Sequence, residues 1–232
     1  MTTIKRFLKG SIPGGTYVWR KIYAFYKRQR SKNTKLIFTD KYVRNGWGSI
    51  ESKSGYGSEL KQTEKLLNDL PLLFKKYDIK VILDIPCGDF NWMKHVDYDF
   101  ERYIGADIVN ELIERNMRDF HRYGTFKVLN ILKDDLPKAD LIFCRDCLVH
   151  FSYDDIFAAI ENIKRSGAKY LLTTTYPEHK NRNILTGDWR QLNLMDEPFN
   201  LPLPIELLIE GSREPGSKSD KSLGLWTIKS IS

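Results

Sequence analysis

Short apolar runs alternate with amphipathic stretches along most of the chain. The runs are compact and rich in Ile, Leu, Val and Phe, which predicts buried strands over residues 80–85, 102–108, 125–131, 139–146 and 169–176. Stretches with apolar residues on one helical face predict helices over residues 58–76, 109–121 and 152–167. This alternation indicates a doubly wound, Rossmann-like α/β fold, with a mostly parallel sheet and helices on both of its faces.

Two helices and the C-terminal part add detail to this prediction. The helix over 152–167 begins at the N-cap Ser152 and ends at Gly167. Strand-like runs on either side of "REPGSKSDK" predict an antiparallel C-terminal hairpin, which completes a seven-stranded sheet. On the helix over 109–121, the predicted apolar side consists of Leu112, Ile113, Met117 and Phe120.

Composition supports one soluble α/β domain with an appendage. The chain has 232 residues, of which 41% are hydrophobic and 29% are charged. No apolar run reaches the roughly 18–20 residues of a membrane span, and the first residues lack the apolar core of a signal peptide. Three cysteines are too few for a disulfide scaffold. We therefore expect a cytoplasmic protein without a transmembrane segment.

The positive charge is concentrated at the N-terminus. Of the 37 Lys and Arg residues, ten lie in residues 1–39, which contain none of the 30 Asp and Glu residues. The formal net charge of +7 therefore becomes −3 for residues 40–232. We predict a basic amphipathic arm over residues 1–39, whose charge suits an anionic membrane surface, an acidic partner enzyme or nucleic acid equally well. Within it, residues 16–30 form either a helix docked on the domain or an interfacial helix at the inner face of a membrane.

A polar segment over residues 45–63 surrounds Trp47 with four glycines. A flexible linker is one interpretation, but linkers rarely carry Trp and Tyr among their glycines. Binding residues are concentrated on loops, so we favour a lid loop over residues 40–57 that folds over a ligand.

The stretch "VILDIPCGDFNW", residues 81–92, ends a buried strand on Asp84 and continues into residues with small side chains. Ligands of open α/β sheets bind at this carboxyl edge, and Asp107, 23 residues later, matches the acidic residue that binds a ribose. Only Gly88 is present where a pyrophosphate requires several glycines, and Asp89 would repel phosphate. A nucleoside without phosphate fits better, and S-adenosylmethionine is such a ligand.

Four motifs support this interpretation. "LDIPCGDFNWM", "YIGADIV", "FKVLNI" and "DLIFCRDCLVHFS" resemble, in order and spacing, the motifs of class I S-adenosylmethionine-dependent methyltransferases. The resemblance covers residues 58–232 and implies a methyltransferase domain there. Pro86 and Phe90 stand where glycines are usual, and Asn130 stands in place of the more common Asp.

Two further segments, "NGWGSIESKSGYGS" and "TGDWRQLNL…EPFNLPLP", resemble a subgroup found in bacterial surface-polysaccharide gene sets. The resemblance implies O-methylation of a small polar or saccharide acceptor, such as a surface glycan or its precursor.

The resemblance also implies the cofactor contacts. Asp107 is expected to bind both ribose hydroxyls, with a helix cap as the alternative. Residues expected at the adenine are Ile108, Asn130 and Ile131. Those expected at the methionine end are Cys87, Gly88 and Asp89. Further cofactor-binding candidates are Asp84, Pro86, Arg145 and Trp47.

His150 is the candidate general base for an oxygen acceptor, with a pKa near 6.5 and Asp146 orienting its ring. A structural histidine is the alternative. Cys144-x-x-Cys147 with His150 could suggest a metal or redox site, but nothing nearby completes one, so we expect buried, inert thiols and no metal. The polar segment after the fifth predicted strand either binds the acceptor or is a solvated loop; its candidate residues are Arg182, Trp189, Arg190 and Asn193.

Two other functions remain as alternatives. The basic arm could recruit the enzyme to nucleic acid or protein, although the Asn/Asp-Pro-Pro-aromatic turn of amino-methylating DNA enzymes is replaced here by "CRDC". The domain could also be a non-catalytic S-adenosylmethionine-binding module tethered to a partner enzyme. We regard nucleic acid as the less favoured partner.

Overall fold

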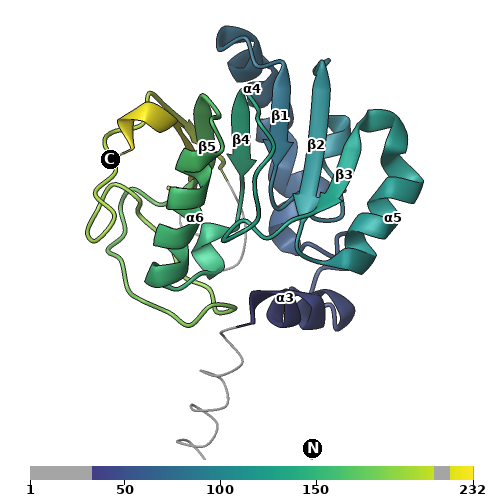
Figure 1. The fold of residues 1–232 in the computed structure, drawn as a ribbon, viewed down its shortest axis with the longest axis horizontal. Helices are drawn as coiled ribbons and strands as arrows, with labels where there is room; N and C mark the ends of the chain where they lie inside the picture. Colours follow the sequence, from purple (N-terminus) through teal and green to yellow (C-terminus); the bar gives the residue numbers. More distant parts are fainter. Residues whose placement is uncertain (1–32, 212–219, 232) are drawn as a thin grey trace, which may run out of the picture.

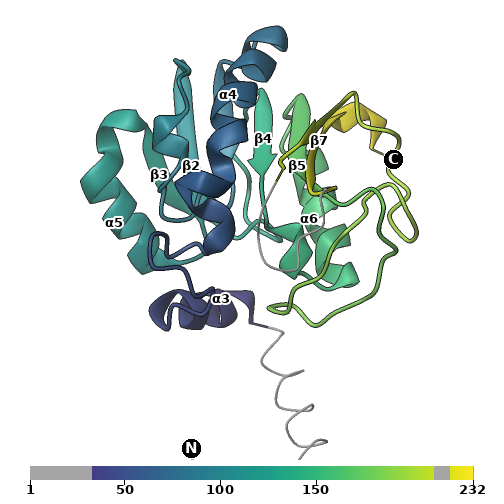
Figure 2. The same cartoon turned by 180° about the vertical axis from the view of Figure 1, so that it is seen from behind.

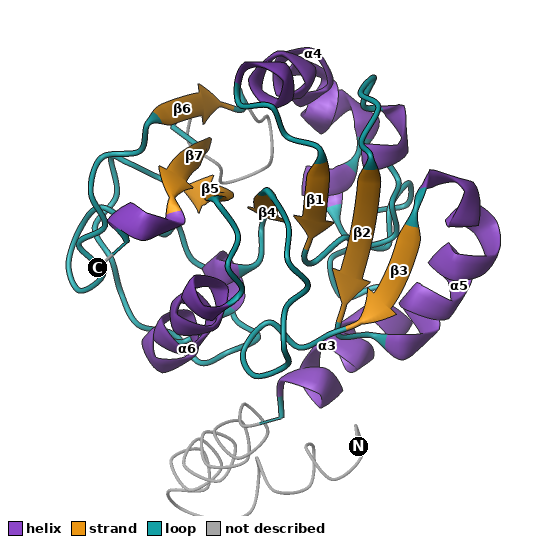
Figure 3. Cartoon of the chain, turned by 45° about the horizontal axis from the view of Figure 1, so that its top comes forward, coloured by secondary structure: helices purple, strands orange, loops and turns teal. Residues whose placement is uncertain are grey.

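The computed structural model describes residues 33–211 and 220–231. Seven strands form one sheet in the order β3-β2-β1-β4-β5-β7-β6 (Figures 1 and 3). Strands β1 to β5 are parallel, whereas β7 runs antiparallel to β5 and β6. This confirms the predicted Rossmann-like fold and its C-terminal hairpin. The strands are β1 Val81–Asp84, β2 Arg102–Asp107, β3 Thr125–Val128, β4 Leu141–Cys144, β5 Tyr170–Thr175, β6 Glu206–Ile209 and β7 Ser222–Thr227.

Helices cover both faces of the sheet (Figures 1 and 2). Helices α4 and α5 belong to one buried cluster and α6 to the other. The α-helices are α3 Thr34–Val43, α4 Leu60–Lys76, α5 Asn110–Phe120 and α6 Tyr153–Arg165. Short 3₁₀ turns lie at Tyr56–Ser58, Met93–His95, His121–Tyr123, Leu148–His150 and Ile228–Ser230.

Successive residues of the central strands point into opposite clusters. Ile82 packs with α4 and α5, while Leu83 packs on the α6 side. Both faces of a parallel sheet are buried, so its strands carry continuous apolar runs rather than alternating ones. Such runs made the strands recognisable in the sequence.

The inner face of α5 differs from its predicted apolar side. Met117, which we predicted on the apolar side of this helix, is 52% exposed. Asn116 is fully buried instead, and its Nδ2 donates a hydrogen bond of 2.8 Å to the Gly88 carbonyl. This hydrogen bond joins α5 to the turn after β1.

Helix α3 crosses the boundary predicted between residues 39 and 40 and lies at the carboxyl ends of the parallel strands (Figure 1). The helix proposed over residues 16–30 lies outside the described residues. In the described part of the chain, no helix has both the length and the apolar character needed to cross a membrane.

Candidate cofactor and active site

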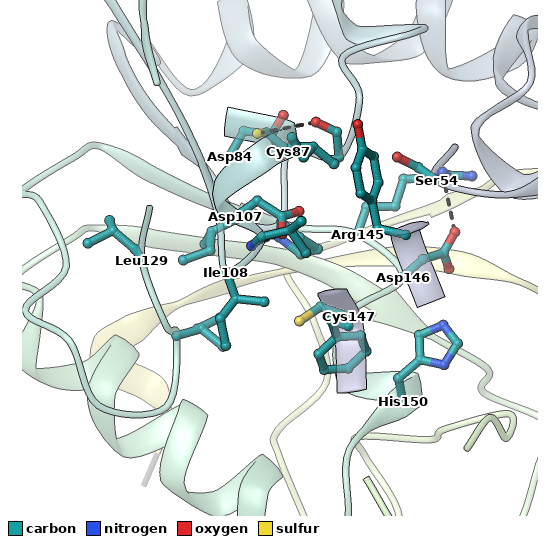
Figure 4. Close-up of a pocket in the computed structure, with 18 of the residues that line it drawn as sticks. Ser54, Asp84, Cys87, Asp107, Ile108, Leu129, Arg145, Asp146, Cys147 and His150 are labelled. Carbon is teal, nitrogen blue, oxygen red and sulfur yellow. Dashed lines mark hydrogen bonds and ion pairs between the residues drawn. The ribbon is translucent and has the colours of Figure 1, made fainter. Parts of the chain in front are cut away.

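A pocket opens at the carboxyl edge of β1, β2 and β4, with about 1040 Å³ of empty space when its mouth is included. Figure 4 shows Asp84, Asp107, Ile108 and Leu129 on one side and Asp146 and His150 on the other. The predicted site residues in its wall are Trp47, Asp84, Pro86, Cys87, Gly88, Asp107, Ile108, Asn130, Ile131, Arg145, Asp146 and His150.

The turn after β1 requires glycine at position 88. Gly88 has φ +54°, a left-handed conformation that side chains disfavour. A Cβ atom here would also lie 2.2 Å from Ser54 Oγ. The glycine-rich segment therefore packs directly on this turn.

Asp89 holds that segment in place. Its carboxylate accepts hydrogen bonds from the Lys53 backbone N–H at 2.7 Å, Ser52 Oγ at 2.9 Å and Ser54 Oγ at 3.1 Å. Asp89 does not line the pocket, so the structure gives it a different role from the predicted contact with the methionine end. In the described structure, the predicted lid loop is a hydrogen-bonded wall that includes Trp47.

Two buried carboxyl groups face the pocket. Asp84 is 3% exposed and accepts a hydrogen bond of 2.5 Å from the Tyr103 hydroxyl. Burial raises the pKa of Asp84 to about 7. Asp107 accepts from the Val109 backbone N–H at 3.0 Å, and burial raises its pKa to about 6 in spite of such backbone bonds. Both sites would favour a ligand that brings positive charge or hydroxyl donors.

Asn130 lines the pocket, but its amide has protein partners. Its Oδ1 accepts from the Leu132 backbone N–H at 2.9 Å, and its Nδ2 donates to Thr34 Oγ1 at 3.3 Å. Both polar atoms of the amide that we predicted to meet an adenine thus have a hydrogen bond within the chain. Ile108, together with Leu129, gives this part of the wall an apolar surface.

A network of four charged residues, of which Arg145, Glu210 and Lys221 are buried and Asp146 is partly exposed, lies at the end of β4. Arg145 Nη2 is 2.6 Å from Glu210 Oε2, Lys221 Nζ is 2.8 Å from Asp146 Oδ2, and Arg145 Nη1 is 3.3 Å from Asp146 Oδ2. Burial alone would raise the pKa of Asp146, but Lys221 and Arg145 hold it well below its usual range. Asp146 therefore presents an ionised carboxylate, which accepts hydrogen bonds and is too weak a base to remove a proton.

His150 presents an unprotonated ring nitrogen. Its Nδ1 lies 2.8 Å from the Asp188 carbonyl, which only accepts, so Nδ1 carries the proton and Nε2 has the free lone pair. The group that orients the His150 ring by a hydrogen bond is therefore the Asp188 carbonyl, and not Asp146 as the sequence predicted. Burial lowers the pKa of His150 to about 4, so the ring is neutral at pH 7. Trp47 lies edge-on to it, with ring centroids 6.3 Å apart.

Cys87, Cys144 and Cys147 are free, buried thiols. Contact with Cys144 and burial raise the pKa of Cys147 well above its ordinary value, so it stays a protonated thiol. Within residues 33–211 and 220–231, no three His, Cys, Asp or Glu side chains are grouped so that they could hold a metal ion.

The segment after β5 does not bring its four candidate residues to the pocket wall. Arg190 is 1% exposed and Asn193 is 7% exposed, and the amide of Asn193 donates to the Pro177 carbonyl at 2.8 Å. Both side chains are therefore buried and make contacts within the folded chain. Trp189, which is 40% exposed, and Arg182 remain at the surface.

Sequence reasoning missed the contribution of α3 to the pocket. Thr34, Phe38 and Tyr42 all line it and are spaced by four residues, which places them on one helical face. This spacing was present in the sequence, but residues 1–39 were assigned to the arm. Glu210 and Lys221 had no comparable signal, because they lie far from β4 in the sequence.

Solved structures with a similar fold include methyltransferases. The methyltransferase domain of bacterial CtHen1-CN matches with a TM-score of 0.53 and 16% identity, over 72% of this chain and 99% of that one. Magnesium protoporphyrin IX methyltransferase (ChlM) from Synechocystis PCC 6803 with bound SAM matches with a TM-score of 0.55 and 13% identity, over 83% and 96%. The chain therefore has the Rossmann-like methyltransferase fold. No protein-family model and no curated protein matches it.

Proposed function

We propose that the protein is an S-adenosylmethionine-dependent methyltransferase whose cofactor binds in the described pocket. The observation that carries the proposal is the pair of buried carboxyl groups, Asp84 and Asp107, at adjacent strand ends beside the Gly88 turn. These groups suit a cationic nucleoside and oppose a phosphate. The named methyltransferases with the same fold support the assignment.

The residues present fit S-adenosylmethionine. Asp107 would accept hydrogen bonds from the ribose hydroxyls, and Ile108 and Leu129 would pack on the adenine. Asp84 and the turn at Gly88 would hold the methionine end. When bound, S-adenosylmethionine supplies a methyl group on a positively charged sulfur.

Replacing Asp107 by alanine should weaken S-adenosylmethionine binding by about 1.5–3 kcal/mol, because hydrogen bonds to a charged group are lost. Titration calorimetry would measure this change. Asp119→Ala, an exposed carboxylate on α5, is the control and should bind normally. Wild-type affinity in Asp107→Ala would remove Asp107 from the site.

Cofactor affinity should increase with pH through about 7. The pKa of Asp84 is raised to about 7 in the free protein, so Asp84 is mainly protonated below that pH and must release its proton to face a cation. The dissociation constant should therefore rise as pH falls below 7, approaching about tenfold per pH unit, and rise more steeply below about 6, where Asp107 is protonated as well. Calorimetry in buffers of different ionisation enthalpy would count the released proton. An Asp84→Asn variant that kept the same pH dependence would contradict this assignment.

For the acceptor we propose a hydroxyl of a small polar molecule or saccharide, as in a surface glycan or its precursor. His150 Nε2 would take the hydroxyl proton as the oxygen bonds to the methyl carbon and the bond from that carbon to sulfur breaks, with neutral S-adenosylhomocysteine as the leaving group. Asp146 would accept a hydrogen bond from the acceptor. Trp47 and Phe38, stacked with centroids 6.5 Å apart, offer an aromatic surface for the C–H face of a sugar ring. Titration with sugar nucleotides and glycan fragments, with S-adenosylhomocysteine present, tests this; no binding by any would contradict it.

We further propose that residues 1–39 attach the enzyme to an anionic membrane surface, since they hold ten basic and no acidic residues. Deleting residues 1–30 leaves α3 intact. This deletion should abolish sedimentation with anionic vesicles and leave cofactor affinity within about twofold. Vesicle binding by the truncated chain, or none by the full chain at low salt, would refute the proposal.

A further inference from the structure

The segment that follows β5 is hydrogen-bonded to the turn that carries His150. We call residues 187–190 the clasp. Backbone bonds join Gly187 N–H to the His150 carbonyl at 2.8 Å and Arg190 N–H to the Val149 carbonyl at 3.1 Å. The His150 ring donates in the other direction, from Nδ1 to the Asp188 carbonyl at 2.8 Å. The clasp and the turn therefore hold each other in one geometry.

The side chain of Arg190 spans this turn from end to end. Its Nη1 donates to the Leu148 carbonyl and its Nη2 to the Phe151 carbonyl, each at 2.9 Å. The guanidinium thus bonds the carbonyls on both sides of His150. Because these bonds use its outer nitrogens and the side chain is 1% exposed, Arg190 is unsuited to the acceptor contact predicted from the sequence.

The burial of Arg190 calls for a reason. Its guanidinium donates to two backbone carbonyls rather than to a carboxylate, and its buried Nε has no hydrogen-bond partner among the described residues. Burial accordingly lowers the pKa of Arg190 to about 10. An unpaired buried charge is costly to a fold, so its retention here suggests a task at the turn it holds.

The charge of Arg190 also acts on His150. Burial is the main cause of the low pKa of His150; Lys41 of α3 and Arg190 lower it further, while the bond to Asp188 and the charge of Asp146 raise it. A cation beside the ring disfavours the imidazolium form. Arg190 therefore fixes the ring in space and favours its neutral state.

We propose that Arg190 is a positioning residue for His150, holding the turn 148–151 on the clasp so that Nδ1 stays protonated and Nε2 stays the hydrogen-bond acceptor at the pocket. The importance of this for methyl transfer rests on the proposed function, in which His150 is the base. The geometry itself does not depend on that function.

Nitrogen NMR of the four histidines tests the proposal in the cofactor-free full chain, with His150→Asn assigning the His150 signals. Wild-type His150 should remain neutral, protonated at Nδ1, from pH 8 down to about 5. In Arg190→Gln, the pKa of His150 should rise measurably and both tautomers should appear. Arg190→Lys, which keeps the charge but cannot bridge both carbonyls, should mix the tautomers with a smaller pKa rise. Arg122→Gln, which alters an exposed arginine outside the clasp, should leave both properties of His150 unchanged.

Kinetics provide a second readout. Arg190→Gln should lower kcat by about 10- to 100-fold, the scale expected for a misplaced catalytic group, with cofactor affinity within about twofold. Protonation of wild-type His150 at Nε2, or a folded Arg190→Gln with wild-type tautomer and pKa, would overturn the proposal. If Arg190→Gln does not fold, the tautomer of His150 in the wild-type protein and in Arg190→Lys tests the proposal instead. A protein that binds no S-adenosylmethionine refutes the proposed function but leaves the NMR test intact.

Discussion

Replacing His150 by asparagine should lower turnover by about 10²–10⁴-fold, the usual contribution of a positioned general base. Asparagine can still donate to the Asp188 carbonyl, but it has no basic nitrogen to replace Nε2. Cofactor affinity should change little, because Asp84 and Asp107 lie on other strands. Steady-state kinetics at saturating acceptor would measure the loss.

The pH profile separates this role from a structural one. We expected a pKa near 6.5 from the sequence, but burial moves that of His150 to about 4. The base is neutral above its pKa, so wild-type kcat at saturating cofactor should be level between about pH 6 and 8, whereas a base with a pKa near 6.5 would make kcat rise over this range. Near-normal turnover in His150→Asn would refute the assignment and leave methyl transfer to proximity and orientation.

Replacing Phe90 by alanine should lower the free energy of unfolding by about 3–5 kcal/mol, the range for truncating a core aromatic. Phe90 is 3% exposed, and its ring contacts those of Tyr103, Phe120, Tyr123 and Phe126 with centroids 5.2–5.4 Å apart. The ring fills a core site next to the cofactor turn. Urea denaturation followed by circular dichroism would measure the change.

Glycine at the same position is the matched comparison, because glycine is usual there in the related motif. Phe90 has φ +58°, which glycine adopts freely and alanine does not. Phe90→Gly should therefore be about 1 kcal/mol more stable than Phe90→Ala and still less stable than wild type. A loss below about 1 kcal/mol in both variants would show that the aromatic cluster contributes little.

The fold could be predicted from the sequence because its signals are local and repeated. Each central strand is a compact apolar run, and Ser152 caps α6 as expected, accepting from the Asp155 backbone N–H. The location of the pocket followed as well, since ligands bind where parallel strands end. Asp107 was placed there by its distance along the chain from Asp84.

The predictions for polar loop residues could not reach the same accuracy. Asp89, Asn130, Arg190 and Asn193 were assigned to ligands, and the structure shows each bonded to this chain's own backbone or side chains. A sequence shows that a side chain can hydrogen-bond, but not with which partner. Loop backbone groups need partners as much as ligands do.

Ion pairs between residues far apart in the chain could not be predicted from the sequence either. Lys221 lowers the pKa of Asp146, and Glu210 pairs with both Lys221 and Arg145. Lys221 reaches Asp146 because β7 lies beside β5. The wall formed by α3 was missed for a different reason: the absence of acidic residues set residues 1–39 apart as an arm, although Phe38 packs on the pocket.

Calorimetric titration of S-adenosylmethionine into the full chain, with a metal chelator present, tests the central claim most directly. We predict saturable one-to-one binding with a dissociation constant below about 1 mM, the upper end of common enzyme affinities. No saturable binding would contradict the assignment of the pocket. Binding that the chelator abolished and a divalent ion restored would contradict the proposal that the residues described here hold the cofactor without metal.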